Sequence, residues 1–163
     1  MPSPFPKAGE GEKAWRGYRE KATSAFFIRT YYPLVFIAMA IIKNFTLPAS
    51  VKELIVGPDS KIFIAFVSSL DPVTKQAWCP DVRAAMPHIT ETFAGDDTPS
   101  LAIVEVGQKP EWANSQNVYR TTWATRNIPA LVRYQNVNGE VTETSRLVEG
   151  EILNKQKLQA FMA

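Results

Sequence analysis

Two apolar runs with an amphipathic helical pattern between them constrain the fold of this chain most strongly. KIFIAFVSS (61–69) and SLAIVEVG (100–107) are rich in β-branched and aromatic residues and lack the alternation of a one-sided strand. Such runs are typical of strands that are buried on both faces. The stretch between them, CPDVRAAMPHITETF (79–93), has apolar residues on one helical face, namely Val82, Ala85, Met86, Ile89 and Phe93. This order predicts a parallel strand–helix–strand unit in an α/β sheet.

The C-terminal third of the chain predicts a change to antiparallel pairing. ALVRYQ (130–135) and TSRLVEGE (144–151) have the composition of strands, and Asn138-Gly139 between them is a strong hairpin turn signal. NKQKLQAFM (154–162) then predicts a short amphipathic helix that closes the chain.

Two further helices complete the predicted order. NFTLPASVKELIV (44–56) predicts a short strand and then a helix opened by Pro48 and Ser50. NVYRTTWAT (117–125) predicts a helix with inward-facing residues, namely Val118, Thr122 and Trp123. The expected order is βαβαβαββα, which is a three-layer α/β fold with a central mixed sheet. The expected domain spans residues 44–163.

Residues 1–43 predict an N-terminal extension. The first 24 residues are polar and rich in Pro, Gly and charge, so we expect them to be disordered or to form a marginal helix over 12–21. Residues 25–42, AFFIRTYYPLVFIAMAII, leave two alternatives open: a membrane anchor or interfacial helix, or an extension packed loosely on the domain. Pro33 interrupts the segment, and the remaining run of 34–42 covers only half of a bilayer, so membrane contact is the less favoured alternative.

The composition excludes several classes of function. Residues 45–163 contain 11 Lys/Arg and 13 Asp/Glu, so they lack the basic field that is typical of nucleic-acid binding. The chain has one cysteine, which excludes an internal disulfide framework and a cysteine-based zinc site. A single thiol fits a reducing compartment, and we therefore expect a cytoplasmic protein.

That one cysteine, Cys79, lies where thiol chemistry is favoured. Pro80 is well suited to the first position of a helix, which puts Cys79 at or next to the N-cap. The free N–H groups and the positive dipole end there favour a thiolate. The residue also ends a loop after a predicted central strand, where open α/β sheets place their sites. A buried structural cysteine is the alternative.

The arrangement resembles the thioredoxin fold, and more narrowly the thioredoxin domain-containing protein 17 family. Trp78-Cys79-Pro80-Asp81, the polar loop 70–77 and VEVGQKPEW (104–112) carry the likeness, with Gly107, Lys109, Pro110 and Trp112 in the family's V-G-x-K-P-x-W stretch. Ile128-Pro129 resembles the segment that ends in the family's cis-proline, which lies against the active cysteine. The resemblance covers about residues 44–162.

The resemblance implies a function for these residues. Family members reduce protein disulfides and release thiols from cystine and from nitrosylated or persulfidated cysteines, with electrons from thioredoxin reductase. It implies that Cys79 is the nucleophile, and that the substrate contacts are Trp78, Pro80, Asp81, Ile128 and Pro129. The expected partners are disulfide-containing peptides, proteins or cystine-like compounds, with glutathione or thioredoxin reductase as electron source. We expect a monomer with no bound cofactor, no metal and no nucleic-acid partner.

The sequence departs from the family motif W-C-P-D-C at Val82, which stands where the second cysteine would be. In the dithiol cycle the second thiol resolves the mixed disulfide, so here an external thiol would have to release it. Two hypotheses remain open: a monothiol protein-disulfide reductase that acts through Cys79 in its WCPDV motif, and a redox-inactive binding module of the same fold.

Overall fold

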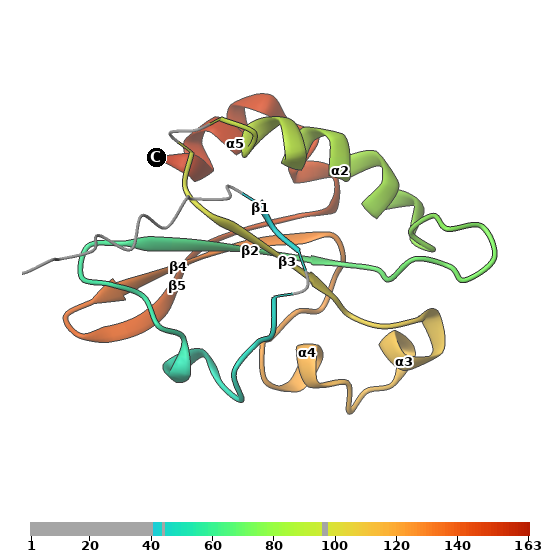
Figure 1. Ribbon diagram of the computed structural model, residues 1–163, viewed down its shortest axis with the longest axis horizontal. Coiled ribbons are helices and arrows are strands. Elements are labelled where there is room, and N and C mark those ends of the chain that lie inside the picture. The colour runs from blue at the N-terminus through green and yellow to red at the C-terminus, as the bar shows by residue number, and fades with distance from the viewer. Residues whose placement is uncertain (1–40, 44, 96–97) are drawn as a thin grey trace, which may run out of the picture. The chain divides into compact units, whose positions relative to one another are not determined.

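The computed structural model describes residues 41–43, 45–95 and 98–163, which build a five-stranded mixed sheet (Figure 1). The strands are β1 (Ile41–Ile42), β2 (Lys61–Val67), β3 (Leu101–Glu105), β4 (Ala130–Val137) and β5 (Glu140–Val148). Their order across the sheet is β1-β3-β2-β4-β5. β3 pairs in parallel with β1 and β2, whereas β2–β4 and β4–β5 are antiparallel. The predicted mixed sheet is therefore confirmed.

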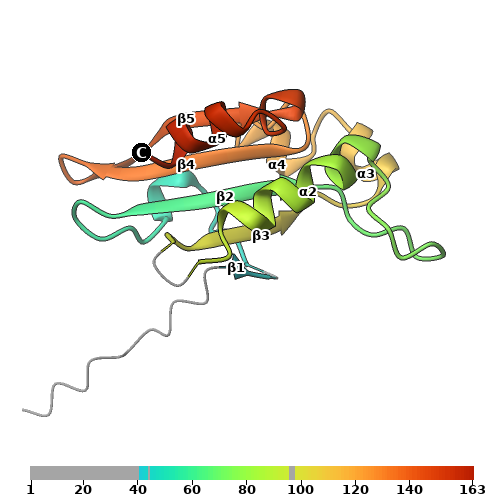
Figure 2. The ribbon, with the colours of Figure 1, turned by 90° about the horizontal axis from the view of Figure 1, so that it is seen from above.

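Helices cover both faces of this sheet (Figures 1 and 2). α2 (Pro80–Thr92) and α5 (Lys155–Met162) lie on one face, and the short helices α3 (Lys109–Ala113) and α4 (Val118–Thr121) lie on the other. Residues 63–67 of the central strand β2 are all buried, as the unbroken apolar run predicted. The three-layer α/β architecture of the prediction is confirmed.

α2 begins and packs as its sequence predicts. Cys79 is the N-cap, with extended backbone angles (φ −83°, ψ 123°), and Pro80 opens the helix. The inward face buries Val82, Ala85 and Ile89, while Met86 is only half-buried. These apolar contacts, together with the T-shaped aromatic pairs Phe63–Phe93 and Phe63–Phe161, fix the helix layer on the sheet.

The hairpin between β4 and β5 also forms at the predicted turn. Asn138 and Gly139 both have positive φ (55° and 87°), as a type I′ hairpin turn requires. The second strand begins earlier than predicted, at Glu140, because its polar first residues continue the ladder at the edge of the sheet. It also ends earlier, because residues 149–151 form a 3₁₀ turn with Glu149 at a positive φ of 47°.

Two other predictions for local structure are wrong. The first strand lies at Ile41–Ile42, where it pairs with Leu101 and Ala102, and not within 44–47. The helix expected after Ser50 is only a 3₁₀ turn, Val51–Glu53. Its amide bonds follow the tighter i to i+3 pattern, with Leu54 N–H donating to the Val51 carbonyl at 3.1 Å.

The predicted helix over 117–125 is also shorter and oriented differently. α4 ends at Thr121, since Ala124 adopts a positive φ of 49° and Thr125 N–H bonds to the Tyr119 carbonyl at 2.9 Å. Val118 is 51% exposed and Thr122 is exposed, so only Trp123 of the three expected inward residues is buried. The helix α3 that precedes α4 was not predicted.

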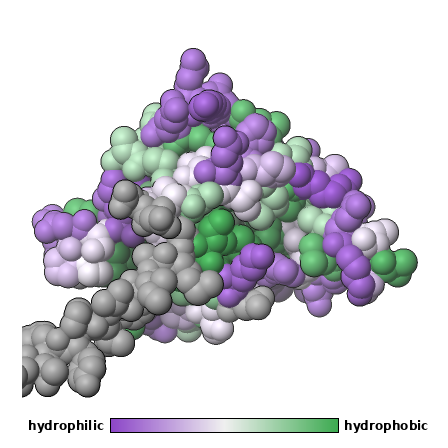
Figure 3. Space-filling view, turned by 45° about the horizontal axis from the view of Figure 1, so that its top comes forward, coloured by the Kyte–Doolittle hydropathy of each residue, from purple (hydrophilic) through white to green (hydrophobic). Residues whose placement is uncertain are grey.

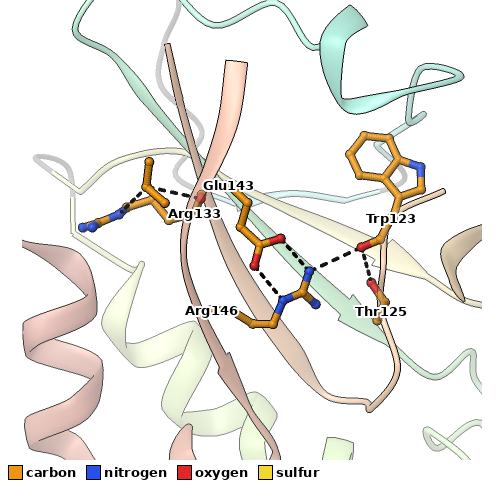
Figure 4. A network of polar contacts seen from close by, with 6 residues as sticks. Trp123, Thr125, Arg133, Glu143 and Arg146 are labelled. Atoms are coloured by element: carbon orange, nitrogen blue, oxygen red, sulfur yellow. Dashed lines mark hydrogen bonds and ion pairs between the residues drawn. The ribbon is translucent and has the colours of Figure 1, made fainter. Parts of the chain in front are cut away.

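An ion pair on β5 anchors the segment that follows α4 (Figure 4). Arg146 donates two hydrogen bonds to the Glu143 carboxylate, at 2.8 and 2.7 Å, and one to the Trp123 carbonyl at 3.3 Å. The pairing of β4 with β5 shifts between Arg133 and Tyr134, where β5 contains one extra residue without a partner on β4. This bulge places Glu143 and Arg146 on the same face of β5, whereas regular pairing would place them on opposite faces. The bulge thereby ties the chain before residue 128 to the sheet.

The N-terminal extension was predicted to span 1–43, and its apolar segment 25–42. Of these residues, 1–40 lie outside the described part of the chain. Within the described ranges, no helix is long and apolar enough to cross a membrane.

Candidate functional site

The thiol of Cys79 lies at the end of β2, where the loop 68–78 turns into α2. The backbone N–H of Cys79 donates to Ser68 Oγ at 3.2 Å, which fixes the helix start against the strand end. The cysteine is free and 7% exposed. Its thiol points at the carbonyl oxygen of Ile128, with Sγ 3.8 Å from that oxygen. Sequence reasoning did not single out Ser68.

Ile128 and Pro129 approach the cysteine from the other side. The bond between them is cis, as the resemblance implied. Both residues are buried, and the Pro129 carbonyl accepts a hydrogen bond from Glu149 N–H at 2.9 Å. The structure thus brings Ile128 against Cys79, whereas Pro129 and Pro80 do not line the hollow around the thiol.

The other motif residues differ in exposure. Pro80 and Asp81 are exposed on the first turn of α2, while Trp78 is half-buried. The indole N–H of Trp78 donates to the Gly107 carbonyl at 3.0 Å, so the ring is held in place by the loop after β3. The Arg83 guanidinium donates to the carbonyl of Ala77 at 2.6 Å and so holds the end of the loop 68–78 against α2.

Val82 is buried on the inward face of α2, three residues after Cys79. It is 1% exposed and lines a hollow of about 510 Å³ beside α2, together with Phe45, Met86 and Ile103. Figure 3 shows hydrophobic surface gathered near the centre of its view, bordered by hydrophilic side chains. The position of the missing resolving cysteine is therefore an apolar one.

The stretch from Gly107 to Trp112 forms a wall of the thiol site. Gly107 has φ 94°, and a Cβ there would collide with a carboxylate oxygen of Glu111. That carboxylate accepts the Gln108 N–H at 2.6 Å and caps α3. Glycine is thus required at position 107, where the loop turns into α3.

Trp112, at the other end of this stretch, is 8% exposed, and the Arg120 guanidinium lies 4.2 Å above its ring.

Cys79 lies in an open hollow of about 370 Å³. Of the residues weighed from the sequence, the hollow collects Trp78, Cys79, Asp81, Lys109, Trp112 and Ile128. The lining residues that sequence reasoning missed are Ala113, Arg120, Arg126, Asn127 and Glu149. Arg126 and Asn127 directly precede Ile128-Pro129, which was a usable signal. No sequence signal pointed to Arg120 or Glu149, because these residues reach the hollow from α4 and from the turn after β5.

Known proteins resemble this chain in sequence. Residues 43–163 match the family described as thioredoxin domain-containing protein 17-like, thioredoxin domain. A thioredoxin domain-containing protein of Schizosaccharomyces pombe is 33% identical over 107 residues, which are 66% of this chain and 86% of that protein. The thioredoxin-like protein Clot of Arabidopsis thaliana is 32% identical over 95 residues, 55% of this chain and 71% of that one. The human thioredoxin domain-containing protein 17 is 28% identical over 103 residues, 63% of this chain and 77% of that one.

Among solved structures, a Plasmodium falciparum thioredoxin aligns with a TM-score of 0.43 at 14% identity, over 63% of this chain and 70% of that one. A Trichomonas vaginalis thioredoxin aligns with a TM-score of 0.40 at 13% identity, over 62% and 78%. The family match covers most of the chain and includes every residue of the thiol site. This chain belongs to the thioredoxin domain-containing protein 17-like family and has its thioredoxin-like domain.

Proposed function

We propose that this protein is a monothiol thioredoxin-like oxidoreductase that attacks disulfides through Cys79. The observation that carries the proposal is the position of the thiol: it sits at the N-cap of α2, in an open hollow, 3.8 Å from the Ile128 carbonyl. Helix N-termini stabilise thiolates, which are the nucleophilic form. Membership in a thioredoxin-domain family supports the same reading.

The chemistry has two steps. First, the Cys79 thiolate attacks one sulfur of a disulfide R–S–S–R′, which forms Cys79–S–S–R, and R′–S⁻ leaves and takes a proton from solvent. Second, an external thiolate R″–S⁻ attacks the sulfur of R, which forms R–S–S–R″ and frees the Cys79 thiolate. The electron pair that reduces R′ therefore comes from the external thiol, and no bound cofactor takes part.

The second step must be external because the chain has no other sulfur nucleophile. Cys79 is the only cysteine of the sequence, and Val82 stands at the resolving position. Glutathione or the thioredoxin reductase system would supply the electrons. The substrates would be disulfide-containing peptides or proteins, or cystine-like compounds.

A substrate would approach the thiol between two walls. Pro80 and Asp81 are exposed beside it, and the half-buried Trp78 is the third contact expected on that side. On the other side, the backbone of Ile128 ahead of Pro129 would pair with an extended peptide segment as a short β-bridge.

One observation favours the second candidate function, a binding module without turnover. Val82 is 1% exposed and packs as a core residue, so the site is completed without a second thiol. In this case the hollow beside Ile128 would hold the partners without forming a covalent bond.

Trapping the mixed disulfide distinguishes the two functions. The purified protein is incubated with a peptide disulfide, quenched with acid and measured by intact mass spectrometry. A mass increase by one half of the disulfide, absent in Cys79→Ser and reversed by glutathione, supports the oxidoreductase. If the parent protein binds the peptide but forms no adduct, the protein is a binding module and the proposed oxidoreductase function is wrong.

A further inference from the structure

The hollow around Cys79 carries an unusual set of charges. Its cationic side chains are Lys109 on α3, Arg120 on α4 and Arg126 in the loop before Ile128, and its carboxylates are Asp81 and Glu149. The lining is thus net positive by one charge, although residues 45–163 as a whole are negative. The thiol is therefore surrounded by a local charge opposite to that of its domain.

These cations are not neutralised by their neighbours. Among the described residues, no ion pair within 4.0 Å involves Lys109, Arg120 or Arg126. Glu149 is instead engaged with the amide of Asn127, whose Nδ2 donates to its carboxylate at 2.8 Å. The positive groups remain available to a ligand that enters the hollow.

One of the cations is held in a fixed orientation. Arg120 donates its Nε–H to the Trp112 carbonyl at 2.9 Å, and its guanidinium stacks on the Trp112 ring. This anchoring leaves the two terminal nitrogens to bind a carboxylate, for which the planar guanidinium is well matched. Lys109 and Arg126 are exposed and add attraction without fixed geometry.

We infer that the external thiol which releases Cys79 is a small anionic one, with carboxylates that bind Lys109, Arg120 and Arg126. This inference rests on the proposed function and names the class of its co-reactant. The volume of about 370 Å³ is within the range for small-molecule sites, roughly 300–1,000 Å³, and suits a ligand the size of a tripeptide. Because Val82 cannot resolve the mixed disulfide, this thiol must reach the sulfur inside the charged hollow.

The test measures the release step alone. Cys79 of the full-length protein is first converted to a mixed disulfide with 2-mercaptoethanol, a neutral adduct. Its loss is then followed by acid quench and intact mass spectrometry after adding glutathione or its glycine ethyl ester, which lacks one carboxylate. Each rate is divided by the rate of the same thiol with hydroxyethyl disulfide in solution, which removes differences in intrinsic nucleophilicity.

We expect the normalised rate with glutathione to exceed that with the ester by roughly two- to fivefold, the effect of one exposed ion pair. The ratio should fall in Lys109→Gln/Arg126→Gln, where only the anchored Arg120 remains, and should reach about one when Arg120→Gln is added. It should also fall in 1 M salt, where the screening length drops to about 3 Å. The control Lys52→Gln/Lys155→Gln removes two exposed lysines outside the hollow and should keep the parent ratio.

The outcomes separate this inference from the proposed function. Equal normalised rates for the two thiols in the parent, or a ratio that survives the triple variant Lys109→Gln/Arg120→Gln/Arg126→Gln, would overturn the anionic preference while leaving the monothiol cycle intact. If no mixed disulfide forms, or if neither thiol releases it, both this inference and the proposed monothiol function are wrong. Far-UV circular dichroism of each variant confirms that the compared proteins are folded.

Discussion

Cys79 and Ile128 are 49 positions apart in the sequence, yet the thiol of Cys79 lies 3.8 Å from the Ile128 carbonyl oxygen. The contact joins the start of α2 to the segment that enters β4. Since β4 pairs directly with β2, which ends in the cysteine loop, the sheet itself sets this approach. The site therefore depends on how each loop is anchored to the sheet, and the first predictions concern those anchors.

Ser68 is expected to be a positioning residue for the thiol. It is 2% exposed, and its hydroxyl accepts the Cys79 N–H. Ser68→Ala would leave that buried amide without its partner, at a cost of about 1–3 kcal/mol in the free energy of unfolding. Urea unfolding measures the cost, and the rate of mixed-disulfide formation should fall as well.

Ser69→Ala is the matched control for this variant. Ser69 is only half-buried, and a surface-type change there should stay within about 0.5 kcal/mol. Equal stabilities for Ser68→Ala and Ser69→Ala would show that the hydroxyl does not anchor the helix start.

Alanine substitutions at Gly107 and Gly139 allow the stability cost of a steric clash to be separated from the cost of backbone strain. Both have positive φ, 94° and 87°. Alanine at Gly139 meets nothing within 4 Å and should cost about 1 kcal/mol, the penalty of left-handed backbone. Alanine at Gly107 should cost clearly more, because its Cβ also displaces the Glu111 carboxylate that caps α3.

The measurement for this pair is urea unfolding, together with tryptophan fluorescence. Trp78 bonds to the Gly107 carbonyl, so its emission should change in Gly107→Ala but not in Gly139→Ala. If the two variants lose the same stability, the close approach of Glu111 carries no energetic weight.

The buried phenol of Tyr134 should lower the free energy of unfolding at alkaline pH. Burial, reinforced by the nearby charge of Glu143, raises the pKa of this phenol above its ordinary value of about 10. As pH rises past about 10, the unfolded chain loses the proton first, so the free energy of unfolding should fall until the folded pKa is passed. Denaturant titrations from pH 8 to 11 should show this fall in the parent and a smaller one in Tyr134→Phe.

The same variant should be more stable at neutral pH. The Tyr134 hydroxyl is buried without a hydrogen-bond partner among the described residues. Removing an unsatisfied buried hydroxyl should raise the free energy of unfolding by about 1 kcal/mol. Tyr119→Phe, at a half-buried ring, is the control, and a destabilised Tyr134→Phe would contradict the prediction.

Sequence reasoning succeeded where one physical signal dominated. The apolar runs of β2 and β3, Pro80 after Cys79, and Asn138-Gly139 each fix a local structure with little help from tertiary contacts. It failed where tertiary contacts decide. β1 lies at Ile41–Ile42 because β3 offers it a partner. Helix α3 was missed for another reason, since its capping contact between Glu111 and the Gln108 N–H is a local signal that the sequence contained.

The lining of the thiol hollow could be predicted only in part. Trp78, Asp81 and Ile128 are adjacent to recognisable motifs. Arg120 and Glu149 reach the hollow only because α4 and the turn after β5 fold against it. No periodicity or spacing in the sequence encodes that meeting of three distant segments.

The last prediction concerns Val82, which is 1% exposed on the inner face of α2. Val82→Cys restores a second thiol three residues after Cys79, a spacing that brings Cα atoms on one helical turn within disulfide range, about 4.4–6.8 Å. We expect it to form an internal disulfide and to reduce insulin with thioredoxin reductase and NADPH much faster than the parent, which lacks a resolving thiol. The smaller side chain should cost about 1 kcal/mol of stability. Val82→Ala removes more volume, at about 2 kcal/mol, without adding a sulfur, and should stay as slow as the parent. A parent that already matches Val82→Cys in this assay would show that the missing cysteine does not limit turnover, whereas a fast Val82→Ala would assign the gain to loosened packing instead of resolution.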